Sequence, residues 1–453
     1  MDKKTFVLSA NIEEGIAEDT RYIVTPNVLK VVQEIVDGYK TGIHSYSIIG
    51  TYGTGKSSFL INLEHDLTTD GEYHVLLKNK DILHKGDFEI LNILGDSKPL
   101  DDLMLAKLQK IMVSEEKDTL MLLKSYYNRL KKNNRFLVIA IDEFGKVLEH
   151  AAKYDPEKEL YFFQKFTEIV NAPTRIILLL TTLHQNFSAY ASKLNKAQKN
   201  EWTKVKGRFK EIVFAEPVEQ LLYLAAEHLS TERCRYNDAK NGNFRDVCNL
   251  AVRNKFVSSD FAFDTAARLF PLDTFSAYSI TRAIQRYGQN ERSLFTFLNA
   301  KGKNSIQSFV VKSYVTFNLS DVYDYVQNNF YSYLNDANSD STCWKAIGMS
   351  IERIEGADWK DPQLMLDAIK IVKAIGIMNL YGNAGFFMNN TDMAEYASKA
   401  LGIEYANTIL HELIRLKIIR FAEYKKRLTN KDMAQRVIEV ERENQSFAFG
   451  ENY

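Results

Sequence analysis

Residues 45–63 read SYSIIGTYGTGKSSFLINL. The run SYSII predicts a short buried strand, and FLINL after the glycines predicts the start of a helix. The stretch between them has the pattern Gly50-x-x-x-x-Gly55-Lys56-Ser57, in which glycine turns let successive backbone N–H groups point inward. A loop of this kind between a strand and a helix is typical of phosphate binding.

The residues of this loop have distinct expected roles. Lys56 is expected to reach the β and γ phosphates of ATP, and the Ser57 hydroxyl is expected to coordinate Mg²⁺. The N-terminus of the following helix adds partial positive charge. The residues expected to bind the nucleotide are Gly50, Thr51, Tyr52, Gly53, Thr54, Gly55, Lys56, Ser57 and Ser58.

A second apolar run ends in two carboxylates. FLVIAIDE (136–143) is continuous enough for a central parallel strand covered on both faces. Its carboxyl end would face the ligand crevice of an open α/β sheet. We expect Asp142 to hold Mg²⁺ through water and Glu143 to orient or deprotonate the attacking water, which favours hydrolysis over nucleotide binding alone.

The rest of the chain to about residue 230 alternates predicted strands and helices, which is typical of a doubly wound α/β domain. Further strands are predicted at 73–79 (YHVLLKN), 175–182 (RIILLLTT) and 211–217 (EIVFAEP), and helices at 23–42, within 100–131 and at 156–171. Beyond residue 230 the periodicity is almost entirely helical.

The length of 453 residues suggests roughly three domains at about 150 residues each. We expect an α/β nucleotide-binding core at 1–230, a helical unit at 231–303 and a second helical domain at 304–453. The ending SFAFGENY (446–453) leaves open that the chain is truncated.

The charge balance excludes a strong overall field, because 58 Lys and Arg residues face 58 Asp and Glu residues. The N-terminus lacks the apolar segment of a signal peptide, and no apolar run reaches about 18 residues. We therefore expect a cytoplasmic protein with no membrane-spanning segment.

Together these residues resemble those of AAA+ ATPases. The resemblance implies an α/β P-loop NTPase core with a parallel sheet, followed by an α-helical lid and a C-terminal helical, winged-helix-like domain. It also implies a polar sensor of the γ phosphate at the tip of the third strand. RIILLLTTLHQN offers Thr181, Thr182 and His184 for this role, and Thr182 is favoured.

The same resemblance implies two arginines at the site. Arg208, in EWTKVKGRFKEIVFAEP (201–217), lies where the family has an arginine finger that reaches the ATP of a neighbouring subunit, with Lys206 and Lys210 nearby. Arg292, in GQNERSLFTFL (288–298), matches the second-sensor arginine of the lid, with Arg286 as the alternative.

IDEFGK, the Arg208 segment and GQNERSLFTFL also resemble large prokaryotic P-loop ATPases of anti-phage defence operons. More distantly, they resemble the origin-recognition and STAND branches. The resemblance implies an ATPase that couples nucleotide state to homo-oligomeric assembly, with a partner effector in bacterial defence. The alternatives are an ATP-dependent DNA-binding initiator or loader, and a signalling switch that holds ADP as a monomer.

Residues 390–430 predict a helix, a turn, a second helix and a strand, which is the order of a winged helix. Residues 415–431 hold seven Lys and Arg residues and one Glu, a local net charge of +6. This segment could contact DNA phosphates, or it could be a solvated face of a packing module. The aromatic residues at 321–334 have helical spacing and are expected in the core.

Overall fold

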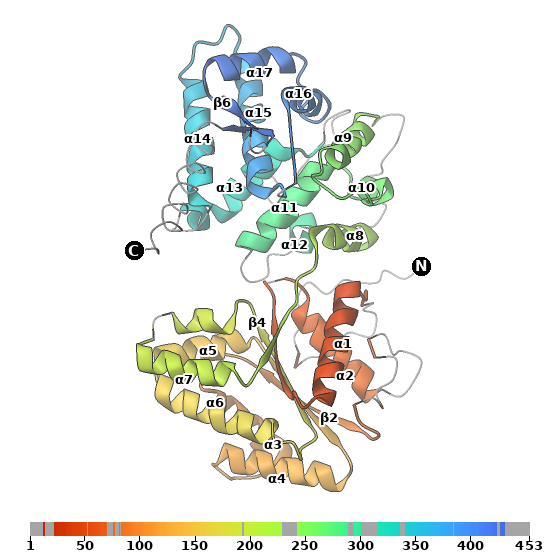
Figure 1. Cartoon of the computed structure of the whole chain (residues 1–453), viewed down its shortest axis with the longest axis vertical. Helices are drawn as coiled ribbons and strands as arrows, with labels where there is room; N and C mark the ends of the chain where they lie inside the picture. Colours follow the sequence, from red (N-terminus) through yellow and green to blue (C-terminus); the bar gives the residue numbers. More distant parts are fainter. Residues whose placement is uncertain are drawn as a thin grey trace, which may run out of the picture. The chain divides into compact units, whose positions relative to one another are not determined.

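The computed structural model describes residues 12–13, 22–51, 53–69, 76–77, 81, 83–192, 194–228, 242–288, 294–299, 306, 316–335, 340–383, 385–423 and 426–430. The chain forms two compact units, Met1–Glu216 and Pro217–Tyr453. Figure 1 labels their helices and strands. The first unit thus ends before the expected boundary at 230, while the division of the second unit at 303 stays a prediction.

The first unit alternates strands with helices. Its strands are β1 (Ser45–Ile49), β2 (Phe88–Leu94), β3 (Phe136–Asp142), β4 (Ile177–Leu183) and β5 (Lys210–Val213). Its helices are α1 (Pro26–Lys40), α2 (Lys56–Thr68), α3 (Leu100–Met112), α4 (Thr119–Lys132), α5 (Phe144–Lys153), α6 (Pro156–Val170) and α7 (Lys196–Lys206), with a 3₁₀ helix, η2 (Phe187–Ala191).

The five strands form one parallel sheet in the order β2-β3-β4-β1-β5. Thr182 of β4 pairs with Ile48 of β1, and Thr181 pairs with Ile141 of β3. Because all strands run in the same direction, their carboxyl ends meet at one edge of the sheet. That edge carries the glycine loop after β1 and the acidic pair after β3.

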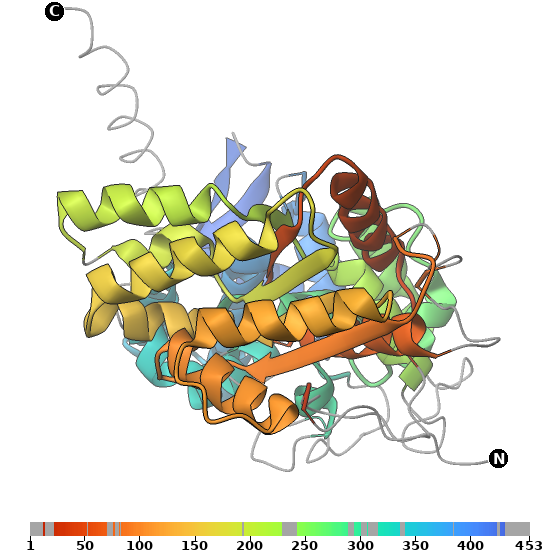
Figure 2. The same ribbon diagram turned by 90° about the horizontal axis from the view of Figure 1, so that it is seen from below.

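Helices cover both faces of this sheet. α1 and α2 pack on one face with Val138 and Ala140 of β3, and α3 to α7 pack on the other with Leu137 and Ile139. The two layers lie on opposite sides of the strands in Figure 1, and Figure 2 shows the edge strand β2 in orange beside the larger layer. Burial on both faces explains why β3 is apolar throughout until Asp142.

The second unit is mostly helical around one apolar core. Its helices are α8 (Val218–His228), α9 (Gly242–Arg253), α10 (Phe263–Arg268), α11 (Thr274–Tyr287), α12 (Leu294–Asn299), α13 (Leu319–Asn335), α14 (Ser341–Glu355), α15 (Pro362–Tyr381), α16 (Asn390–Lys399) and α17 (Ala406–Arg415). Strands β6 (Ile419–Ala422) and β7 (Arg427–Asn430) form an antiparallel hairpin.

The end of this unit has the element order of a winged helix. α16, α17 and the β6–β7 hairpin follow one another, and an isolated parallel bridge joins Met388, before α16, to Arg427 of β7. α15 precedes them and packs against α17 and β7. The sequence predicted helix, turn, helix and strand, but it did not predict α15 or the Met388 bridge as parts of the module.

The expected fold class is confirmed: an α/β P-loop core with a parallel sheet is followed by helices and a winged-helix-like end. The second strand was predicted wrongly, because the edge strand is β2 and not 73–79. Of that predicted strand, Leu76 and Leu77 are outside any strand and the other residues lie outside the described chain. Among the described helices, none combines the length and apolar character needed to cross a membrane.

Candidate active site

The glycine loop between β1 and α2 has the backbone that its sequence requires. Gly53 and Gly55 adopt φ angles of 72° and 89°, in the region that residues with a Cβ rarely enter. A Cβ on Gly50 would lie 2.2 Å from the Phe214 carbonyl oxygen, so only glycine fits there. α2 then begins at Lys56 with no side chain capping its N-terminus. These features make a concave backbone whose first-turn N–H groups suit an anion.

Lys56 is folded back onto the loop. Its Nζ donates to the carbonyl oxygens of Gly50 at 2.6 Å and Thr51 at 2.9 Å. Burial lowers the pKa of Lys56 to about 8, although the carboxylates of Asp142 and Glu143 partly oppose this shift. The ammonium is therefore largely charged at neutral pH, next to the position where phosphate is expected.

The tips of β3 and β4 are joined by a buried hydrogen-bond triangle. The Thr182 hydroxyl donates to Asp142 Oδ1 at 2.5 Å, and the Glu143 N–H donates to the Thr182 Oγ1 at 2.9 Å. The Glu143 N–H also lies 3.0 Å from Asp142 Oδ1. Asp142 and Thr182 are almost fully buried, so the bond between their side chains is made away from water, whereas the two bonds of the Glu143 N–H are partly buried. The triangle therefore holds the side chain of Asp142, the predicted metal ligand, in a fixed position relative to the backbone of Glu143, the predicted base.

Glu143 itself has an unusual backbone and a half-exposed side chain. Its φ of 53° lies in the left-handed region, and its carboxylate pairs with the Lys146 ammonium one turn later. Gly95, which follows β2, donates its N–H to the Asp142 carbonyl at 2.7 Å. A Cβ on Gly95 would lie 2.4 Å from the Glu143 carbonyl oxygen. Gly95 was not predicted from the sequence, because the strand that precedes it, β2, was not predicted; a glycine directly after the apolar run FEILNIL would have been its signal.

The three candidate sensors lie in different surroundings. Thr181 faces β1, where its hydroxyl donates to the Tyr46 carbonyl and lies 3.0 Å from Ser47 Oγ. Thr182 is part of the triangle. Burial lowers the pKa of His184, and the Lys56 ammonium lowers it further. Of the three, Thr182 therefore contacts the acidic pair, and its role as a phosphate sensor stays a prediction.

Glu64 is a further carboxyl near the site that the sequence analysis missed. It lies two turns after Ser57 on α2, where Asn92 of β2 donates to its Oε2 at 2.8 Å. Its Oε1 is buried and has no hydrogen-bond partner among the residues that the structure describes. Burial raises the pKa of Glu64 to about 7, and the negative charge of Asp142 raises it as well. A single charged residue within the apolar face FLINLE was the only signal in the sequence.

Arg208 lies far from the phosphate loop of its own chain. β1 and β5 run parallel, and Tyr46 of β1 lies opposite Lys210 of β5. Arg208 is two residues before this pair and Gly50 is four residues after it, in the same strand direction. Their positions differ by six residues, which is about 20 Å at about 3.3 Å per residue. The Arg208 guanidinium instead pairs with Glu168 of α6, with Nη2 3.1 Å from Oε1. Lys206 and Lys210 pair with Glu211 and Glu34.

Two of the predicted nucleotide contacts, Tyr52 and Arg292, lie outside the described residues. The alternative to Arg292, Arg286, pairs with Asp340 at 3.0 Å and lies over the Tyr381 ring. Arg286 is thus held by contacts within the second unit.

The arrangement fits a magnesium nucleotide. Mg²⁺ usually keeps several waters and takes one or two protein oxygens together with phosphate oxygens, so it needs no cage of side chains. Ser57 at the start of α2 and Asp142 at the tip of β3 supply such oxygens. Within the described parts of the chain, no group of three or more His, Cys, Asp or Glu residues forms a metal site of its own.

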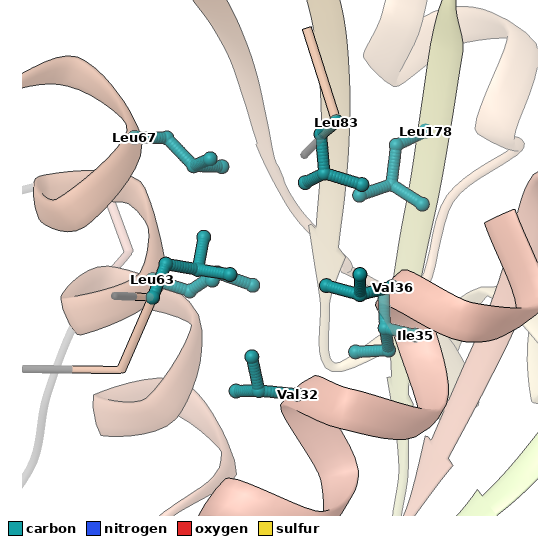
Figure 3. A pocket seen from close by; sticks show the side chains of 8 residues that line it. Val32, Ile35, Val36, Leu63, Leu67, Leu83 and Leu178 are labelled. Carbon is teal, nitrogen blue, oxygen red and sulfur yellow. The ribbon is translucent and has the colours of Figure 1, made fainter. Parts of the chain in front are cut away.

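The pocket drawn in Figure 3 lies elsewhere in the first unit. Side chains from α1, α2 and β4, together with Leu77 and Leu83, line it, and all of them are aliphatic. The space offers about 10 Å³ to the centre of a water molecule, which is room for about one water. This pocket is a packing gap in the core and not a nucleotide site.

No family model matches the chain, and no curated protein matches it. Among solved structures, the Aeropyrum pernix ORC2 protein in its ADPNP-ADP complexes is 13% identical, with 93% of this chain and 95% of that chain covered and a TM-score of 0.34. Cdc6p from Pyrobaculum aerophilum is 11% identical, with 94% and 97% covered and a TM-score of 0.31. The Aeropyrum pernix ORC1 protein in complex with DNA is 12% identical, with 90% of both chains covered and a TM-score of 0.31. At these values the likeness assigns no function to this chain.

The pKa of Lys56 predicts a pH dependence of ATP binding. Bound phosphates hold the proton on Lys56, whereas the free protein loses it as the pH rises through about 8. By linkage, the dissociation constant for ATP should rise by up to about tenfold per pH unit above that pH. Calorimetry between pH 7 and 10 on the Glu143→Gln protein measures this, with Lys56→Met as the control that binds weakly at every pH. A dissociation constant that stays flat would contradict the placement of Lys56 beside phosphate.

Glu64 predicts a pH dependence of stability. As the pH rises above the ordinary pKa of a glutamate, the unfolded chain releases the Glu64 proton while the folded chain keeps it until about pH 7. Stability is therefore lost between about pH 4.5 and pH 7, by roughly 3 kcal/mol for a shift of this size. Between pH 5 and pH 8, the free energy of unfolding of Glu64→Gln should rise by about this amount relative to that of wild type. Urea unfolding at the two pH values measures it. The exposed Glu115→Gln is the control, and an equal pH profile for Glu64→Gln and wild type would refute the assignment.

Proposed function

We propose that this chain is a Mg-ATP-hydrolysing ATPase whose site is completed by a second copy of the chain. The observation that carries the ATPase part is the convergence of Lys56, Asp142 and Glu143 at one edge of a parallel sheet. Lys56 comes from the loop after β1 and the acidic pair from the end of β3, and two hydrogen bonds through Thr182 join the Asp142 carboxylate to the Glu143 backbone.

The residues of the chain divide the work of hydrolysis. The glycine loop binds the phosphates through its N–H groups, and Lys56 leaves its loop carbonyls to contact the β and γ phosphates. Ser57 and Asp142 would hold Mg²⁺, which would supply positive charge to the phosphates. Glu143 leaves Lys146 and takes the proton of the attacking water.

The position of Arg208 supports assembly. At about 20 Å along the strand direction from its own phosphate loop, Arg208 is too far to contact its own ATP. A guanidinium remains charged at every relevant pH and can donate two N–H groups to phosphate oxygens at once. These properties suit an arginine finger that is supplied by a neighbouring chain. Its exposed pair with Glu168 is weak enough to exchange for a stronger phosphate contact.

Mixing two inactive variants tests this proposal. Arg208→Ala lacks the finger and Glu143→Gln lacks the base, so each alone should lose about 10³-fold or more in turnover. In a one-to-one mixture, about a quarter of the head-to-tail interfaces pair an intact site with an intact finger, so about a quarter of wild-type turnover should return.

Lys204→Ala, on α7 beside the finger, is the matched control and should retain wild-type turnover. Recovery should also increase as the total protein concentration rises from nanomolar to micromolar. A mixture as inactive as its components would show that Arg208 does not act on a neighbour. Wild-type turnover by Glu143→Gln would end the proposed hydrolytic role.

The defence role and the partner effector rest on the sequence resemblance alone. They stay predictions, as does the cytoplasmic location. The ADP-bound monomeric switch is the alternative for which ADP co-purifying with a concentration-independent, slow ATPase would be the supporting result.

DNA binding is a second candidate function, because the second unit ends in a winged-helix arrangement. The second helix of the module, α17, exposes Asn407, Thr408 and His411. However, the basic segment is less available than its net charge indicates. Arg427 is buried with its guanidinium over the Phe386 ring, and Arg415 is paired with Glu412.

The structure therefore changes which residues test DNA binding. Lys417 and Lys426 are exposed and Arg420 is partly exposed, so the triple Glu variant of these three should weaken duplex binding without disturbing the core. Loss of three phosphate contacts should reduce the slope of log affinity against log salt by about 3. Lys345→Glu on α14 is the charge control. Absence of duplex binding by the wild type at low salt would exclude this function.

A further inference from the structure

The backbone at Glu143 requires an explanation that the proposed function does not supply. A residue with a Cβ pays about 1–2 kcal/mol to adopt the left-handed region. Glu143 does so at φ 53°, directly at the start of α5. Such a conformation persists only where the surrounding structure holds it.

Thr182 holds the turn from the side of β4. Its hydroxyl proton is donated to Asp142 Oδ1 at 2.5 Å, and its oxygen accepts the Glu143 N–H at 2.9 Å. A hydroxyl has one proton, so in this geometry Thr182 has none left to donate to a phosphate. Its neighbour Thr181 points to the other face of the sheet and cannot replace it.

Gly95 holds the same turn from the side of β2. Leu94 pairs with Asp142 in the sheet, and the Gly95 N–H continues the ladder to the Asp142 carbonyl at 2.7 Å. A Cβ on Gly95 would lie 2.4 Å from the Glu143 carbonyl oxygen and 2.8 Å from its carbon. These two atoms belong to the Glu143–Phe144 peptide, and the Asp142 carbonyl oxygen of the preceding peptide would lie 2.9 Å away, so a larger residue must displace the backbone on both sides of Glu143.

We propose that Gly95 and Thr182 are positioning residues that clamp the Asp142–Glu143 peptide between β2 and β4 and so aim the Glu143 carboxylate. The inference rests on the ATPase function proposed above. It gives Thr182 a different role from the γ-phosphate sensor expected from the sequence, and it gives Gly95 a role where none was expected.

Three variants separate this role from a sensor role. Gly95→Ala and Thr182→Val should each lower kcat by at least about tenfold, because the base is misaimed. Their dissociation constants for ATP and ADP should stay within about threefold of wild type, because the glycine loop is untouched. Thr182→Ser keeps the hydroxyl and should restore most of kcat. Gly348→Ala on α14, where a Cβ meets nothing within 4 Å, is the matched glycine control.

A readout without catalysis keeps the clamp testable if the ATPase proposal fails. Hydrogen exchange of the Glu143 amide, which donates within the triangle, should be at least about tenfold faster in Thr182→Val and Gly95→Ala than in wild type. Exchange in β1 should be unchanged, which shows that the unit is folded. Unaltered exchange at Glu143, or a selective loss of ATP over ADP affinity in Thr182→Val, would overturn the proposal. If both variants show the faster exchange at Glu143 but neither they nor the wild type hydrolyse ATP, only the ATPase function is overturned.

Discussion

The parallel pairing of β1, β4 and β3 is the constraint on which the site depends. The backbone bonds continue past the strands, since the Gly50 N–H donates to the Leu183 carbonyl at 3.0 Å. This alignment brings the loop after β1 and the acidic pair after β3 to the same edge, with Thr182 between them. A register slip of one residue would turn Thr181 toward Asp142's face and Thr182 away from it. Burial on both faces of the sheet makes such a slip costly. The apolar strands therefore maintain the register that keeps Thr182 next to Asp142.

Two charged groups of the site are satisfied within the chain itself. Lys56 is bonded to loop carbonyls, and Glu143 is paired with Lys146. A buried or half-buried charge without partners would be costly, so these contacts stabilise the chain before any phosphate is bound. A nucleotide must then replace the Lys56 contacts with charge-assisted bonds to phosphate, which are stronger than bonds to neutral carbonyls. Under the proposed function, this exchange would favour polyphosphates over small neutral ligands.

Most of the first unit could be predicted from the sequence, for a physical reason. β1, β3 and β4 are covered on both faces and are therefore apolar runs. The edge strand β2 carries the polar residues Glu89 and Asn92, which interrupt its apolar pattern, and it was not predicted. The loop and the acidic pair are local patterns and could be placed on their strands. The clamp at Glu143 could not be predicted, because it depends on Gly95 and Thr182 meeting from distant segments. Counting charges also failed at the winged helix, where packing buries Arg427 in the core.

The location of Arg208 has a consequence for how the chain could regulate itself. Strand direction places a residue before β5 at the opposite edge from the loop after β1, whatever the side chains are. If Arg208 is the finger proposed above, it can serve only a neighbouring site, and hydrolysis would then depend on assembly without any conformational signal through the core. The proposed clamp fits this division of roles, because it would hold the backbone of the base within one chain while the neighbour supplies the cation. Assembly would then add one positive charge to a site in which the nucleotide has already exchanged the loop carbonyls of Lys56 for phosphate.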